Sequence, residues 1–183
     1  MLHGRRIDLR ARAAEDVEIL HSELYDDVSG HARSDGRAWY PHPHGMDAPF
    51  APKPPSPQVA EFSVVLRDGG ELLGNALLWS MDEHNRSAHV GMALRPARRG
   101  QGYGTEILEV LCRYAFAFLG LHRLQLETLS DNVAMIAVAT GRGFQLEGTT
   151  RASSWVEGRF ADDAVFGLLA EEWALRDGVA PQA

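Results

Sequence analysis

Three closely spaced glycines between a predicted strand and a predicted helix constrain this sequence more than any other feature. The segment 94–106 reads Leu-Arg-Pro-Ala-Arg-Arg-Gly-Gln-Gly-Tyr-Gly-Thr-Glu. Glycine lets the backbone curl so that successive N–H groups point into one concavity, and a helix N-terminus adds unsatisfied donors and positive dipole. The segment therefore predicts a pocket for a phosphate or pyrophosphate, to which Arg98 and Arg99 can add charge.

Two common phosphate loops do not fit this segment. A Walker loop ends in Gly-Lys-Ser/Thr, and the segment contains no lysine. A dinucleotide fingerprint needs a third glycine three residues after the second, but Ile107 follows Gly102 and Gly104 at that step. Coenzyme A is the remaining common ligand of this kind.

The spacing of apolar residues around the loop predicts one mixed α/β domain. A chain of 183 residues with 45% hydrophobic content can bury one substantial core. Alternation of apolar and polar residues predicts strands, whereas helical spacing predicts amphipathic helices. We expect strands at 6–10, 61–66, 72–79, 88–94, 123–128, 148–156 and 163–169, and helices at 14–24, 103–119 and 133–140.

A proline-rich segment at 29–58 interrupts this order. It holds seven of the nine prolines, so it cannot be regular helix or central strand throughout, and we expect a long loop with one short helix. Its histidines, His31, His42 and His44, lack an accompanying Glu or Cys at ligand spacing, so we interpret them as solvated and predict no metal site. The domain is then expected to span 1–175, with a frayed, disordered tail at 176–183.

Read as Arg99-x-x-Gly102-x-Gly104, the loop resembles the pyrophosphate signature of the GNAT superfamily of N-acetyltransferases. The resemblance extends from Ile7 to Trp173 and looks closest to the branch of ribosomal-protein N-terminal (Rim-type) acetyltransferases. It implies a single domain whose central sheet is mixed, mostly antiparallel, splayed between two middle strands and flanked by helices. The supporting motifs are Val90 to Pro96, Tyr114 to Phe116, Leu119 to Leu124, Asn132, Gly143-Phe144, Glu147-Gly148, Trp155, Gly158 to Asp163, Leu168-Leu169 and Glu172-Trp173.

The resemblance also implies acetyl-coenzyme A as the acyl donor. Its pantetheine arm would lie between the splayed strands and pair with backbone groups as an added strand would, and one amide there would steady the oxyanion. Asn132 would contact this arm, although it would equally cap the helix starting at Val133. The implied binding residues are Met92, Ala93, Leu94, Arg99, Gly100, Gln101, Gly102, Tyr103, Gly104, Thr105 and Asn132.

Direct attack of a neutral amine on the thioester is the mechanism that the resemblance implies, with a base to remove a proton from the ammonium. Glu127 stands where one N-terminal acetyltransferase group carries a catalytic glutamate; alternatively it is an outward-facing strand carboxylate. His89 lies on the strand before the loop and is of a type that titrates near neutrality; alternatively it is structural. A base acting through water is a third option.

The sequence departs from the family pattern in the helix after Asn132. Met135 and Ala139 stand where relatives carry a Ser or a Tyr that could protonate the departing thiolate, which leaves Tyr103, Ser130 or water for that task. A coenzyme A-binding regulatory module without turnover is therefore an alternative function. A different acyl donor, such as succinyl-coenzyme A, is another.

The acceptor is expected to be an amine, either a protein N-terminus or a small molecule. Freeing the neutral amine at pH 7 costs about 1 kcal/mol for an α-amine and about 4.6 kcal/mol for a lysine, so a site without an evident strong base favours a low-pKa amine. The net charge of −7 argues against nucleic acid, and no apolar run of about 20 residues suggests a membrane partner. Cys112, the single cysteine, fits a core position in a cytoplasmic protein. A homodimer is expected by resemblance only.

Overall fold

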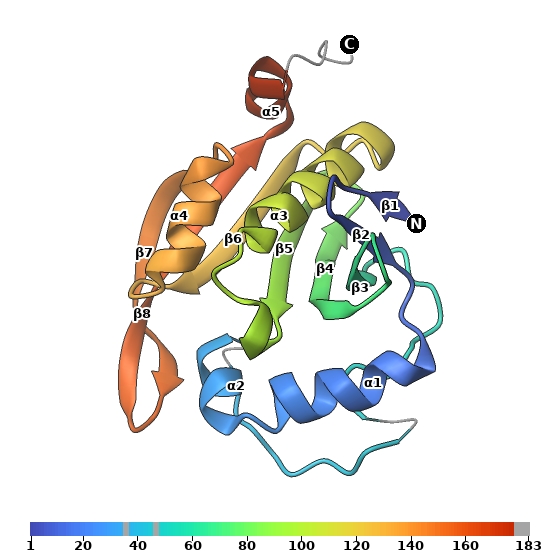
Figure 1. The fold of residues 1–183 in the computed structure, drawn as a ribbon. Coiled ribbons are helices and arrows are strands. Elements are labelled where there is room, and N and C mark those ends of the chain that lie inside the picture. The colour runs from blue at the N-terminus through green and yellow to red at the C-terminus, as the bar shows by residue number, and fades with distance from the viewer. Residues whose placement is uncertain (35–36, 46–47, 178–183) are drawn as a thin grey trace.

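Eight strands form one sheet in the computed structural model, which describes residues 1–34, 37–45 and 48–177 (Figure 1). The strand order is β1-β2-β3-β4-β5-β6-β8-β7, and every neighbouring pair is antiparallel except β5 and β6, which are parallel. The mixed, mostly antiparallel sheet predicted from the sequence is confirmed. The strands are β1 (Leu2–His3), β2 (Ile7–Arg10), β3 (Ala60–Leu66), β4 (Leu72–Asp82), β5 (Ser87–Leu94), β6 (Arg123–Leu129), β7 (Gln145–Val156) and β8 (Arg159–Leu169).

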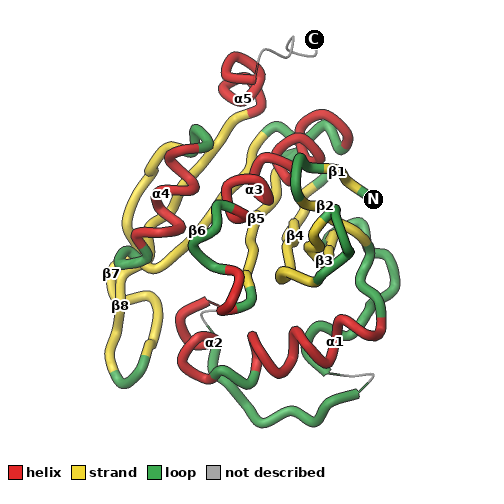
Figure 2. Tube along the Cα trace, in the orientation of Figure 1, coloured by secondary structure: helices red, strands yellow, loops and turns green. Residues whose placement is uncertain are grey.

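Helices cover the sheet from both sides. On β4, Leu73 joins the large core cluster that contains the apolar residues of α3, whereas the adjacent Leu72 packs in a smaller cluster with Leu20 at the end of α1. Because successive strand residues point to opposite faces, α3 and α1 cover opposite faces. Figure 2 shows α3 and α4 together, apart from α1 and α2. The helices are α1 (Ala14–Leu20), α2 (Val28–Ser34), α3 (Tyr103–Arg113), α4 (Val133–Gly141) and α5 (Ala170–Asp177), and π-helical turns extend α1 (His21–Tyr25) and α3 (Tyr114–Phe118).

The apolar stripe of α3 provides much of the core. Ile107, Leu111 and Ala115 recur at four-residue spacing and are fully buried, as an amphipathic helix packed on a sheet requires. Cys112 is also buried in this core, which confirms its prediction as a core residue. Among the described residues, no helix combines the length and apolar character needed to cross a membrane.

The structure differs from three predictions about the C-terminal part of the chain. The strand expected at 148–156 begins at Gln145, and the strand expected at 163–169 begins at Arg159, so the final hairpin is longer than predicted. Mixed polar residues hide the extra length of these strands in the sequence, because β7 is a largely exposed edge strand. Helix α5 reaches Asp177 and buries Trp173 and Ala174, so the prediction of fraying after Trp173 and of disorder at 176 and 177 was wrong. The rest of the predicted tail, 178–183, lies outside the described residues. Within the proline-rich segment, α2 is the short helix that was expected.

The parallel pair β5 and β6 separates soon after it forms. The two strands are paired only at Ser87↔Arg123, Ala88↔Leu124 and His89↔Gln125. Beyond these positions β5 stays paired with β4 as far as Leu94, and β6 stays paired with β8 as far as Leu129. The predicted splay between two middle strands is therefore confirmed.

A buried carboxylate fixes the start of α3 against β2. Glu106 is 2% exposed and accepts hydrogen bonds from the backbone N–H of Arg6 (2.6 Å) and from its Nε (3.1 Å), and a longer one from the N–H of Ile7 (3.4 Å). Burial by itself raises the pKa of the Glu106 carboxyl, but these hydrogen bonds outweigh it and hold the pKa below its ordinary value. The charged form of Glu106 thus stabilises the fold next to the glycine loop.

We predict that Glu106→Gln lowers the free energy of unfolding by about 1–3 kcal/mol at pH 7, because buried N–H groups lose a charged acceptor. Since the folded pKa is lowered, this contribution is present above the ordinary carboxyl pKa of about 4.3 and is lost as pH falls through the folded value. Urea unfolding at pH 7 and at about pH 3, well below the ordinary carboxyl pKa, measures both effects. Glu109→Gln, in the same helix but 37% exposed beside Arg142, is the control and should change stability by less than about 1 kcal/mol. Equal losses in the two variants would contradict the prediction.

Candidate functional site

The glycine loop joins β5 to α3 in a left-handed turn. Gly100 and Gly102 have φ values of 73° and 79°, a region that other residues rarely adopt. Gly102 is the N-cap of α3, and no side chain accepts a hydrogen bond at this cap. The N–H groups in the first turn of this eleven-residue helix are therefore not capped by a side chain, and they lie where the sequence predicts an anion-binding site.

The two arginines of the loop differ in their partners. Arg98 forms an ion pair with Glu71, so its charge is compensated within the fold. Arg99 instead donates from Nε to the backbone O of Leu94 at 3.0 Å, and within the described part of the chain no salt bridge involves it. Arg99 is thus the loop arginine whose charge is available to an external anion.

A third arginine, which the sequence reading missed, lies against the same loop. Arg6 donates from Nη1 to the backbone O of Gln101 at 3.3 Å, and its guanidinium lies 4.8 Å from the ring centroid of Tyr103. Arg6 directly precedes β2, so its contacts with the loop and with Glu106 attach the loop to this strand. No local pattern marks this contact, because Arg6 is separated from the loop by more than ninety residues.

The end of β5 presents backbone groups to the gap. The N–H of Arg95 donates to the O of Leu73 in β4 at 2.9 Å. Because the hydrogen-bonding direction alternates along an antiparallel pair, Ala93 also faces β4, whereas the N–H and C=O groups of Met92 and Leu94 face away from it. Of the three residues expected to pair with a ligand, Met92 and Leu94 therefore face the open edge, where the C=O of Leu94 already accepts a hydrogen bond from Nε of Arg99.

Both candidate bases lie where β5 and β6 separate. His89 belongs to the last residue pair between these strands, and its Nδ1 is 3.8 Å from Oε1 of Glu127. Glu127 also accepts a hydrogen bond from Nε2 of Gln125 at 2.6 Å, and the His89 ring lies 5.3 Å from that of Trp79. With 31% and 46% of their side-chain surfaces exposed, His89 and Glu127 remain accessible. The sequence predicted His89 and Glu127 as two separate candidates for the base, and the structure shows that the two side chains are neighbours.

Asn132 caps helix α4. Its Oδ1 accepts from the N–H of Met135 at 3.2 Å, and its Nδ2 donates to Oγ1 of Thr128 at 2.9 Å. The capping interpretation is confirmed, and both polar atoms of the side chain have partners within the chain.

Helix α2 connects to the far side of the splay. Ser29 donates to Oε1 of Glu157 in the β7–β8 turn at 2.6 Å, and Arg33 donates to Oδ1 of Asp131 after β6 at 2.6 Å. The beginning of the proline-rich segment is therefore held against the half of the sheet formed by β6, β7 and β8.

The three histidines of that segment do not gather at one point. His31 is buried on α2, and His42 is exposed with Nδ1 3.0 Å from the O of Pro43. His44 instead lies beside His21 and Asp26, the one group of potential metal ligands found among the described residues. The sequence reading missed this group because His21 and Asp26 precede the segment.

Fold and site together define an α/β protein with a glycine loop at a helix N-terminus beside a split in its sheet. Residues 6–145 match the model of the Acetyltransferase (GNAT) domain. The chain therefore belongs to the GNAT acetyltransferase family.

Known proteins similar to this chain are N-acetyltransferases by name. An uncharacterized N-acetyltransferase, p20, of Bacillus licheniformis is 29% identical over 64% of this chain and 66% of its own length. YdaF of Bacillus subtilis, which carries a provisional name as a ribosomal N-acetyltransferase, is 33% identical over 57% of each chain. The matches thus span less than two thirds of these relatives. A crystal structure of spermidine N-acetyltransferase from Vibrio cholerae in complex with CoA and spermine has a TM-score of 0.77 at 18% identity, covering 92% of this chain and 98% of that one, and this likeness concerns the fold.

We predict that Asn132→Ala lowers the free energy of unfolding by about 1 kcal/mol, because the first turn of α4 loses its cap. Asn132→Asp should retain most of the stability, since Asp caps helices equally well. Thermal or urea unfolding of the two variants beside the unmodified protein checks this. A stability loss in the Asp variant as large as in the Ala variant would argue against capping as the stabilising role.

Proposed function

We propose that this chain transfers an acetyl group from acetyl-coenzyme A to an amine. The observation that carries the proposal is the separation of β5 from β6 directly before the glycine loop at the start of α3. The gap offers the open backbone edge at Met92 and Leu94, on which the two amides of a pantetheine arm can pair as an added strand does. One ligand that has both a pyrophosphate and such an arm is coenzyme A.

The cofactor's pyrophosphate is assigned to the loop and the first turn of α3. Backbone N–H groups supply the donors, and Arg99 supplies a charge that no acidic side chain of the described chain compensates in an ion pair. Asn132 is proposed to contact the arm from the end of β6 while it keeps its capping bond. The loop residues of this site are Arg99, Gly100, Gln101, Gly102, Tyr103, Gly104 and Thr105.

The proposed reaction is direct transfer. The amine nitrogen attacks the thioester carbonyl carbon, the C–S bond breaks as the tetrahedral oxyanion collapses, and the amide and the coenzyme A thiolate result. The pair of Glu127 and His89 is proposed to take the proton of the ammonium, because both side chains are accessible at the start of the gap. Met135 and Ala139 offer no proton to the thiolate, so Tyr103, Ser130 or water is left to supply it.

The acceptor is proposed to be an amine, with a polypeptide N-terminus first, because its α-amine has a low pKa, and a small polyamine second. Two similar proteins support these classes by their names: YdaF, with its provisional name as a ribosomal N-acetyltransferase, and a spermidine N(1)-acetyltransferase of Vibrio cholerae. The carboxylates of Glu127 and Glu157 and the net charge of −7 favour a cationic acceptor over an anionic one. The closer kinship with the Rim-type branch, a cytoplasmic location and a homodimer belong to the same proposal and rest on family resemblance.

A coenzyme A-binding module without turnover is the second candidate. This candidate is favoured by Met135 and Ala139, because neither side chain can donate a proton to the departing thiolate. Ala139 is also fully buried. Binding without acetyl transfer is its signature.

Release of free thiol from acetyl-coenzyme A, measured with peptides, polyamines and aminoglycosides as acceptors, tests the proposal. We expect release with one amine class, and a fall in kcat of about 10²–10⁴-fold in Glu127→Gln or in His89→Ala, whichever removes the base. Calorimetry should show nearly unchanged coenzyme A affinity in both variants. Glu171→Gln, exposed on α5, is the control with full activity. Tight binding with no release from any amine would support the second candidate.

A pair of neighbouring substitutions tests the cofactor loop. We predict that Arg99→Ala weakens acetyl-coenzyme A binding about tenfold, because a charge-assisted contact is worth about 1.5–3 kcal/mol and Arg99 is exposed. Arg98→Ala should change affinity little, since its charge is already paired with Glu71. Calorimetric titration at two salt concentrations measures both variants. Equal losses of affinity in the two variants would mean that the pyrophosphate is not bound mainly by Arg99, as proposed.

A further inference from the structure

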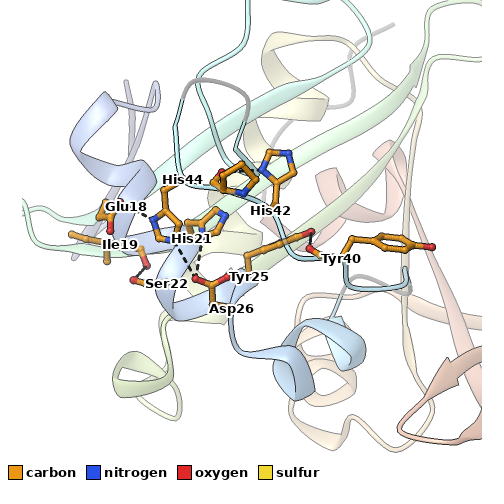
Figure 3. A network of polar contacts seen from close by, with 10 residues as sticks. Glu18, Ile19, His21, Ser22, Tyr25, Asp26, Tyr40, His42 and His44 are labelled. Carbon is orange, nitrogen blue, oxygen red and sulfur yellow. Dashed lines mark hydrogen bonds and ion pairs between the residues drawn. The ribbon is translucent and has the colours of Figure 1, made fainter.

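A cluster of two histidines and two carboxylates lies at the C-terminal end of α1 (Figure 3), on the π-helical turn whose Glu23 forms an ion pair with Arg95 at the end of β5. His21 and Asp26 come from the π-helical turn that extends α1 and from the residue that follows it. His44 comes from the proline-rich segment, and Glu18 lies one turn earlier on α1. Figure 3 shows the contacts that join these four residues, with His42 outside them.

The distances suit a small tetrahedral metal ion. Oδ2 of Asp26 is 3.2 Å from Nδ1 of His21 and 3.2 Å from Nε2 of His44. With metal–ligand bonds of 2.0–2.1 Å, the ligand atoms of a tetrahedral zinc site are about 3.3 Å apart. The three potential ligand atoms all lie within 4.8 Å of one another, so a modest side-chain adjustment brings them into range.

His44 has the outer contact that metal-bound histidines usually have. Its Nδ1 is 2.8 Å from Oε2 of Glu18, while its Nε2 faces Asp26. A proton on Nδ1, held by the Glu18 carboxylate, fixes the tautomer and leaves Nε2 as the ligand atom.

His21 supplies an independent indication. Its side chain is fully buried, its ring centroid is 3.9 Å from that of His44, and its Nε2 has no hydrogen-bond partner within the described residues. Nδ1 is the ring nitrogen that faces the Asp26 carboxylate. A lone pair cannot face a carboxylate favourably, so either a proton or a cation must lie between the two groups.

We propose that His21, Asp26 and His44 bind a divalent d-block ion, with zinc as the best match. Two imidazoles and one carboxylate are ligands that zinc accepts, and the exposed sides of Asp26 and His44, about 40% each, leave a fourth position to water. Calcium and magnesium prefer sites built from oxygen alone. This inference does not depend on the proposed acetyl transfer.

The ion would connect the proline-rich segment, through His44, to the C-terminal end of α1, through His21 and Asp26. The hydroxyl of Tyr25 already donates to the backbone O of Tyr40 at 2.8 Å, so the segment has one attachment on the same turn. Asp26 lies two residues before the start of α2, whose Ser29 and Arg33 contact the other half of the sheet. A metal bond at Asp26 would therefore hold the start of α2 as well as residue 44.

Calorimetric titration of chelator-treated protein with Zn²⁺ tests this site. We expect one equivalent to bind, with affinity reduced at least tenfold in His44→Gln and in Asp26→Asn, and no reduction in the matched control His42→Gln. Both test positions are partly exposed, so the variants should fold, and circular dichroism checks this. Mg²⁺ should not compete at equal concentration.

Limited trypsin digestion gives a readout independent of affinity. Zn²⁺ should slow cleavage at the exposed Arg37 in the unmodified protein and in His42→Gln, but not in His44→Gln. Failure of the unmodified protein to bind one equivalent would overturn the proposal. Equal weakening in His42→Gln and His44→Gln would do the same, because binding would then be scattered over surface histidines.

Discussion

The pairing of β5 with β6 stops after three residue pairs, and the arrangement of the site depends on this. A strand edge in the middle of a sheet carries N–H and C=O groups that need partners. In this chain the edge at Met92 and Leu94 opens next to the N-terminus of α3, so two kinds of backbone donor meet at one gap. The folding of a single segment, from β5 through the loop into α3, therefore creates the proposed cofactor site.

Contacts from distant segments hold the two sides of the gap. Glu106 and Arg6 attach the loop and α3 to β2, which belongs to the first half of the sheet. Helix α4 packs on α3 and is capped by Asn132 from the end of β6, so it spans the split on one face. On the other side, Ser29 and Arg33 connect α2 to the second half. The separation is thus maintained by side chains as well as by strand direction.

The sequence predicted those features that are encoded by neighbouring residues, and it did not predict contacts between residues far apart in the chain. The glycine loop, α3 and the Asn132 cap are encoded within a few residues, and all three were predicted correctly. The splay was expected only through family resemblance, because no local pattern states where two strands stop pairing. Glu106 looked like an ordinary first-turn residue, and its buried contact with Arg6 depends on a pairing across a hundred residues. His21 is a buried residue within the helix predicted at 14–24, and its proximity to Asp26 and His44 became visible only in the structure.

The three residue pairs between β5 and β6 are also the pivot about which any relative rotation of these two strands would occur. From His89 to Leu94 the strand runs about 16 Å at about 3.3 Å per residue, so a rotation of about 4° at the pivot displaces the far end by about 1 Å. The candidate bases His89 and Glu127 lie at the pivot, where such a rotation moves atoms least. The glycine loop lies at the far end, where it moves them most. A rotation of the two halves of the sheet about these pairs would therefore change the width of the gap at the glycine loop more than the geometry at His89 and Glu127.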